Sequence, residues 1–206
     1  MDEFVIDQSV WQHGLTFPAL IEGMDVNQAA MRRRFHSVQL TRGETERLAA
    51  LTAQRRILVL TEEWCTDCLM NLPILAHLAE AAPAIDIRFF VRKDWPDLRT
   101  YFNSRDIYSL PTVQIMDAQF TPLSVWVERP QAAHQALSDW KTAHPDIERT
   151  RRRADLTSEQ KREMLRLVNE QLLVEMEEWY SQRLQSETVR EVTEALEALE
   201  RDPQGV

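Results

Sequence analysis

The feature that most restricts the fold of this chain is the short segment in which both of its cysteines occur. Cys65 and Cys68 are the only cysteines among 206 residues, and two residues separate them. The continuous apolar run at 57–60 precedes them and is typical of a strand buried on both faces. From Leu69 onward, apolar residues recur at helical spacing. We therefore expect the cysteines at the junction between a buried strand and a helix.

A C-x-x-C pair at such a junction indicates chemistry and not structural cross-linking. A disulfide between residues this close would constrain the unfolded chain very little. The first N–H groups of a helix and its dipole stabilise a thiolate, which favours Cys65 as the attacking thiol. Cys68 follows about one helical turn later, on the same face, and could resolve a mixed disulfide formed on Cys65. The pattern thus predicts a redox-active dithiol.

The composition is that of a folded globular protein and argues against several kinds of partner. Hydrophobic residues make up 44% of the chain and charged residues 28%, so it can bury a core. The formal net charge of −9 argues against nucleic acids and anionic membranes, which bind positive surfaces. The acidic start lacks the features of a signal peptide, and no run of about 18 apolar residues occurs. We therefore expect a cytoplasmic protein that binds neither nucleic acid nor membrane.

The pattern beyond the cysteines predicts a mixed α/β fold. The first fifty residues are expected to be helical, with Thr41 and Glu44 at capping-box spacing. After the helix that carries Cys68, we expect a strand at 85–91, a helix at 94–102, and strands at 112–116 and 123–127. This order predicts an α/β sandwich whose last two strands pair antiparallel.

The last third of the chain is expected to be helical throughout. Pro145 marks the end of one amphipathic helix or the start of a linker. A broad apolar stripe then runs from Met164 to Tyr180, and a final helix is expected at 186–199. The stripe has to bury against the rest of the chain or against another subunit. A homodimer through the C-terminal helices is therefore one expectation.

The residues around the dithiol resemble those of the thioredoxin family. Trp64 precedes the first cysteine as in the family's W-C-x-x-C, and Asp67 gives the W-C-x-D-C form of thioredoxin-related proteins. Pro73 lies where family members carry a proline in the active-site helix. The segment Leu110-Pro111-Thr112 is similar to the family's hydrophobic-Pro-Thr segment, whose proline is cis and packs beside the cysteines.

This resemblance implies a three-layer thioredoxin-like sandwich with a mixed sheet, extended by N-terminal and C-terminal helices. It implies a thioredoxin-like domain at residues 52–143. A helical extension at 1–51 would pack on that core, and a second extension would occupy 144–206. By the same resemblance, the residues that support the two thiols or form a platform for the substrate are Trp64, Asp67, Leu110, Pro111 and Thr112.

The resemblance also implies an activity, the reduction of disulfides through Cys65 and Cys68. Such a reductase needs no bound cofactor. Its substrate would be a protein or a small molecule that contains a disulfide. Its electrons would come from a thioredoxin-reductase-like system or a low-molecular-weight thiol. We expect no metal, because a structural zinc site needs four ligands and no histidines with paired spacing lie near Cys65.

The sequence departs from the family in the acid–base groups near the thiols. Val59 occupies the position where thioredoxins usually carry a buried aspartate, so the usual proton acceptor for Cys68 is missing. Asp67 or Glu63 is the expected replacement. Nearby carboxylates also disfavour a thiolate. We therefore expect Cys65 to be less acidic than the thiol of thioredoxin, whose pKa is about 7.

Two other functions are compatible with the sequence. The missing aspartate and the long helical additions also suit a redox-inactive interaction module, in which the flanking helices bind a partner. Alternatively, the protein could sense redox state, with oxidation of the two cysteines changing how the C-terminal helices dock. Two thiols that never form a disulfide, even with a strong oxidant, would favour the interaction module.

Overall fold

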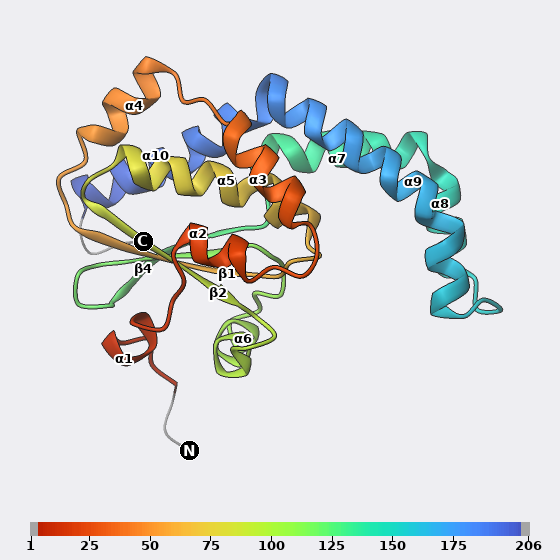
Figure 1. Cartoon of the computed structure of the whole chain (residues 1–206), viewed down its shortest axis with the longest axis horizontal. Coiled ribbons are helices and arrows are strands. Elements are labelled where there is room, and N and C mark those ends of the chain that lie inside the picture. The colour runs from red at the N-terminus through yellow and green to blue at the C-terminus, as the bar shows by residue number, and fades with distance from the viewer. Residues whose placement is uncertain (1–3, 203–206) are drawn as a thin grey trace. The chain divides into compact units, whose positions relative to one another are not determined.

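The computed structural model of the chain describes residues 4–202. It contains two compact units (Figure 1). One unit, here called the sheet unit, comprises Met1–Arg129 and Thr188–Val206. The other, here called the helical unit, is Pro130–Glu187. The expected division into 1–51, 52–143 and 144–206 stays a prediction.

The sheet unit is built on a four-stranded mixed sheet with the strand order β2-β1-β3-β4. Its strands are β1 (Arg55–Thr61), β2 (Ile85–Val91), β3 (Thr112–Met116) and β4 (Pro122–Val127). The central strand β1 pairs parallel with β2 and antiparallel with β3, and β3 pairs antiparallel with β4. The side chains from Ile57 to Leu60 are buried, which explains why this strand is a continuous apolar run.

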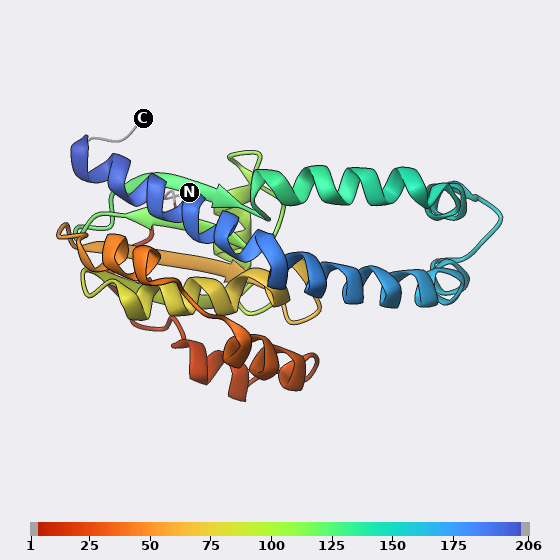
Figure 2. The ribbon, with the colours of Figure 1, turned by 90° about the horizontal axis from the view of Figure 1, so that it is seen from above.

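Helix α5 (Thr66–Ala81) follows β1 and carries the second cysteine. It contacts α3 (Gln28–Ser37) and α4 (Arg42–Ala49) as well as β2, and Figure 2 shows α3 on the side of α5 that faces away from the sheet. Covered on more than one side, α5 is buried along most of its length. Helix α6 (Pro96–Asn103) lies on the opposite side of the sheet in Figure 1. The expected thioredoxin-like sandwich is thus confirmed.

The N-terminal segment covers one edge of the sheet. Two short helices, α1 (Gln8–Trp11) and α2 (Phe17–Glu22), flank Leu15. Leu15 and Phe89 of the edge strand β2 exchange backbone N–H···O bonds of 2.9 Å each, so the edge is paired. Gly14 permits this approach, since a Cβ there would lie 2.6 Å from the ring of Phe90.

The end of the chain returns to the sheet unit through α10 (Gln185–Arg201). The apolar side of α10 is buried at Val189, Val192, Leu196 and Leu199. Arg47 of α4 forms two hydrogen bonds of 2.9 Å with the carboxylate of Glu197. The guanidinium of Arg55 donates to the carbonyl of Leu199 at 3.0 Å. These contacts are the reason that residues from Thr188 onward belong with the sheet unit.

The helical unit is a pair of antiparallel helices joined by a shorter one. It contains α7 (Gln131–Ala143), α8 (Pro145–Arg152) and α9 (Ser158–Trp179), and α9 continues through a π-helical turn (Tyr180–Leu184) into α10. Pro145 therefore begins a helix. Figure 2 shows α7 and α9 side by side. Together with α8 they form a small core of Leu137, Trp140, Ile147 and Leu165.

The apolar stripe of α9 is buried only in part. Leu165 and Met176 are buried, whereas Met164, Leu167 and Val174 are 52%, 66% and 65% exposed. In the described part of the chain, no helix combines the length and the apolar character that crossing a membrane would require.

Candidate active site

Cys65 occupies the N-cap position of α5, where β1 has ended and the helix begins. Its sulfur accepts the backbone N–H of Cys68 at 3.2 Å, and its thiol donates to the carbonyl oxygen of Leu110 at 3.5 Å. Both cysteines are free thiols; Cys65 is 8% exposed and Cys68 is fully buried. Cys65 thus keeps a small exposure to solvent, whereas Cys68 has none.

The two thiols differ in acidity. A hydrogen bond with the Cys68 thiol lowers the pKa of Cys65 from the ordinary value of a thiol, although burial and the charge of Asp67 oppose this effect. Burial raises the pKa of Cys68 far above the ordinary value, and the neighbouring Cys65 raises it further. Cys65 consequently ionises first, as an attacking thiol must.

The segment before β3 supports the first thiol. The Leu110–Pro111 peptide bond is cis, as the resemblance implied. The carbonyl of Leu110 accepts the Cys65 thiol, and the N–H of Glu128 donates to the carbonyl of Pro111 at 2.8 Å. The hydroxyl of Thr112 donates to the carbonyl of Ser109 at 2.8 Å and is not directed at the sulfurs.

A pocket of about 340 Å³ opens beside Cys65. It is lined by Trp64, Cys65, Thr66, Asp67, Arg92, Tyr108, Ser109, Leu110 and Glu128. Trp64 and Tyr108 are 64% and 62% exposed, which is unusual for large aromatic side chains. The guanidinium of Arg92 lies 5.7 Å from the ring centre of Trp64. The first thiol thus faces an open pocket with aromatic side chains.

The two carboxylates expected to accept the proton of Cys68 both have strong partners already. Asp67 is paired with Arg129 through two hydrogen bonds, of 2.8 and 2.5 Å. Glu63 accepts the backbone N–H groups of Asp25 and Val26 and the ammonium of Lys93. The role of proton acceptor stays a prediction for both residues.

The surroundings of Cys68 contain an oxygen that the sequence did not single out. Val59 is completely buried, as the apolar replacement of the missing aspartate should be. Two residues further along β1, the hydroxyl of Thr61 forms a hydrogen bond with the Cys68 thiol, which lowers the pKa of that thiol against the effect of burial. A hydroxyl can orient the thiol proton, although it is too weak a base to hold that proton.

Glu63 should contribute more to stability than to chemistry. The Lys93 ammonium and two backbone N–H groups hold its pKa below the usual range. Replacing Glu63 by glutamine removes the charge from a buried network and should lower the free energy of unfolding by about 1–3 kcal/mol near pH 7. A depressed pKa contributes stability above the unfolded value of 4.5, so this loss should shrink as the pH falls through the folded pKa.

Urea unfolding at neutral and acidic pH measures this effect. The matched control is Glu46→Gln, because Glu46 forms only an exposed ion pair with Arg42 on α4 and should contribute less than about 0.5 kcal/mol. If both variants lost the same free energy of unfolding, the buried contacts of Glu63 would not contribute the stability predicted for them.

Arg129, Tyr108 and Asn71 were likewise not identified from the sequence as residues around the dithiol. Arg129 lies 62 residues from Asp67, so no local pattern relates them. Tyr108 belongs to a loop without periodicity. Asn71 did carry a signal, since it is a lone amide in the apolar run 69–75 of α5, and a polar side chain in such a position needs partners.

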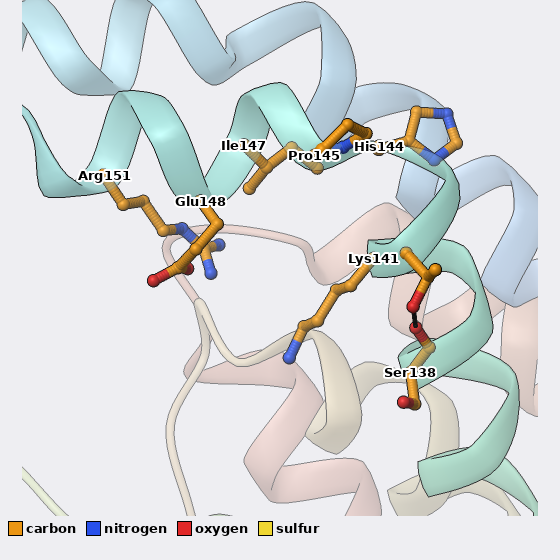
Figure 3. Close-up of a pocket in the computed structure, with 8 residues that line it drawn as sticks. Ser138, Lys141, His144, Pro145, Ile147, Glu148 and Arg151 are labelled. Atoms are coloured by element: carbon orange, nitrogen blue, oxygen red, sulfur yellow. Dashed lines mark hydrogen bonds between the residues drawn. The ribbon is translucent and has the colours of Figure 1, made fainter.

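The helical unit has a pocket of its own, shown in Figure 3. It has a volume of about 360 Å³ and is lined by Ser138, Lys141, Thr142, His144, Pro145, Ile147, Glu148 and Arg151. Figure 3 shows Lys141 and Arg151 directed toward the same space. The carboxylate of Glu148 is bound to Arg152 at 2.7 Å. This pocket offers positive charge and no nucleophilic thiol.

Within 4–202, no three side chains of His, Cys, Asp or Glu gather in a way that could hold a metal ion.

Comparisons with known proteins agree with this geometry. A family model described as thioredoxin matches residues 14–141. A Pseudomonas aeruginosa protein of unknown function is 22% identical with a TM-score of 0.62, and the match covers 94% of this chain and 99% of that one. An HIV epitope scaffold is 24% identical with a TM-score of 0.61, covering 92% of this chain and 96% of that one. At these identities the likeness shows the fold alone. No curated protein matches the sequence significantly.

Proposed function

This chain belongs to the thioredoxin family, and we propose that it reduces disulfides through the dithiol of Cys65 and Cys68. The observation that carries the proposal is the difference between the two thiols. Cys65 begins a helix, faces an open pocket beside the cis peptide of Pro111 and has a lowered pKa. Cys68 is buried with a raised pKa. A more acidic thiol beside an open pocket, backed by a fully buried thiol, is the arrangement that two-step disulfide exchange needs.

In the first step, the Cys65 thiolate attacks one sulfur of the substrate disulfide. The substrate S–S bond breaks, a bond forms between that sulfur and Cys65, and the other sulfur leaves with the electron pair and takes a proton from water. In the second step, Cys68 loses its proton to water and attacks the sulfur of Cys65, which breaks the mixed disulfide. The second substrate sulfur leaves as a thiolate, so the substrate gains two electrons and the protein becomes a disulfide.

The proposed substrate is a disulfide in a protein or a small molecule, lying against Trp64 and Tyr108. Their exposed rings offer apolar contact on the surface from which Cys65 is reached. A thiol-based donor would return the two electrons, by the same exchange in reverse.

The test is reduction of a protein disulfide with an excess dithiol as the electron donor. Wild type should accelerate the reaction over the dithiol alone, and Cys65→Ser should lower the catalysed rate by at least about 10³-fold, because the remaining thiol, Cys68, is buried and has a raised pKa. Circular dichroism of the variant checks that it is folded. Equal activity of the two proteins would overturn the proposal.

Protein binding without redox chemistry is the second candidate, and the exposed Met164, Leu167 and Val174 on α9 favour it. The two candidates differ in what happens after treatment with a strong oxidant. A reductase forms the disulfide between Cys65 and Cys68, whereas a pure binding module would keep both thiols. Mass spectrometry with alkylation of the remaining thiols distinguishes these outcomes.

A further inference from the structure

The chain leaves the sheet unit and returns to it at residues that are bonded to the first turns of α5. Arg129, the last residue before the helical unit, holds the carboxylate of Asp67 with two hydrogen bonds. Thr188, the first residue after it, donates its hydroxyl to the amide oxygen of Asn71 at 2.8 Å. Asn71 in turn donates to the carbonyls of Asp67 and Glu128, at 2.9 and 3.3 Å. Both chain crossings therefore meet at the helix turn that carries the thiols.

The backbone before Arg129 is held in an uncommon conformation. Glu128 has a φ of 71°, in the left-handed region that side-chain-bearing residues rarely adopt. Its N–H donates to Pro111, its carbonyl accepts from Asn71, and its carboxylate pairs with Arg129 at 2.8 Å. These bonds direct the Arg129 guanidinium onto Asp67, where both side chains are nearly buried, at 10% and 13% exposure.

We propose that Arg129 is a positioning residue for the dithiol, which fixes the Asp67 carboxylate and offsets the negative charge that this carboxylate places beside Cys65. The inference rests on the proposed function, since it concerns how reactive the attacking thiol is. It assigns a purpose to an arginine that does not line the thiol pocket.

The charged groups around Cys65 show why the Arg129–Asp67 pair should affect this thiol more than the other ion pairs do. Asp67, Arg92, Tyr108 and Glu128 line the pocket together with Cys65, and Cys68 is hydrogen-bonded to it. Further charged groups are Glu62 and Glu63, which precede α5, and Arg129, which follows β4. Glu62 is paired with Arg92, and Glu63 with Lys93. Arg129 instead forms ion pairs with two carboxylates, those of Asp67 and Glu128.

Loss of the guanidinium would leave both of these carboxylates without their shared cation. The Asp67 charge already raises the pKa of Cys65, in opposition to the hydrogen bonds from Cys68. Without Arg129 this opposition grows, so less thiolate is present at a given pH.

The experiment is a pH titration of Cys65 in the isolated protein, by thiolate ultraviolet absorbance and by the rate of alkylation with iodoacetamide. Arg129→Gln should slow alkylation about 3- to 10-fold near pH 7 and move the pH profile to higher pH, since one pKa unit is tenfold in thiolate. Asp67→Asn should accelerate it about 2- to 5-fold. In the Asp67→Asn background, Arg129→Gln should have little further effect, because the charge it offsets is gone.

The matched control is Arg47→Gln, which breaks an equally bidentate arginine–carboxylate pair in the sheet unit. It should leave the titration of Cys65 unchanged, even if stability falls. If Arg129→Gln does not fold, Arg129→Lys keeps the charge without the two-pronged geometry and should give a smaller shift in the same direction.

An unchanged pH profile in Arg129→Gln, or equal shifts in Arg129→Gln and Arg47→Gln, would overturn the inference. The titration uses no disulfide substrate, so it is independent of the reductase assay. A shifted profile in a protein that reduces no disulfide would refute the proposed function alone.

Discussion

Replacing Cys68 by serine is expected to stop the reaction after its first step and to leave the substrate covalently joined to Cys65. The attack by Cys65 needs only the first thiol. Release of the second substrate sulfur needs a neighbouring thiol, and Cys68 is the only other cysteine in the chain. Turnover should therefore fall by about 10²- to 10³-fold while a mixed disulfide accumulates.

Mass spectrometry under non-reducing conditions measures this outcome directly. The Cys68→Ser protein should gain the mass of one substrate chain, and a dithiol should remove it. The variant that lacks both cysteines is the control and should gain nothing. Absence of the adduct, with substrate still consumed, would contradict the assignment of Cys68 as the resolving thiol.

Replacing Asn71 by leucine is expected to destabilise the sheet unit by about 2–4 kcal/mol. Asn71 is completely buried, and its amide bridges the carbonyls of Asp67 and Glu128 and the hydroxyl of Thr188. Leucine has a similar volume, so no large cavity forms. The cost comes from taking hydrogen bonds away from buried groups that cannot reach water.

Urea unfolding of Asn71→Leu, Thr188→Val and the double variant measures this cost. The double variant should lose less stability than the sum of the single variants, because the first substitution already breaks the bond between the two side chains. If Asn71→Leu were as stable as wild type, or if the losses of the two single variants simply added in the double variant, the hydrogen bonds of Asn71 would not hold Glu128 and Thr188 to α5.

Several elements follow from residues that are close together along the chain. The apolar run at 57–60 forms the buried strand β1, and the cysteines begin the next helix. Thr41 and Glu44 form the predicted capping box at the start of α4. Such features depend on periodicity and on hydrogen bonds between near neighbours, which the sequence displays directly. The resemblance to thioredoxins added the cis bond before Pro111.

Local patterns could not show with which segments the last helices pack. The apolar face of α10 and the stripe of α9 look alike in sequence, yet residues from Thr188 onward pack with the sheet unit and the segment before them with the helical unit. A helical period shows that one face must be buried. It does not show which partner buries it.

The sequence by itself determined that this protein has a strand–dithiol–helix centre within a thioredoxin-like fold. Only the tertiary structure decided what surrounds that centre: the pairing of Arg129 with Asp67 across 62 residues, the three donors on Glu63 and the hydroxyl of Thr61 at Cys68. The physical reason is the separation along the chain of the residues that interact. Backbone geometry relates residues a few positions apart, whereas the charge beside a thiol depends on which distant segments the sheet topology brings to it.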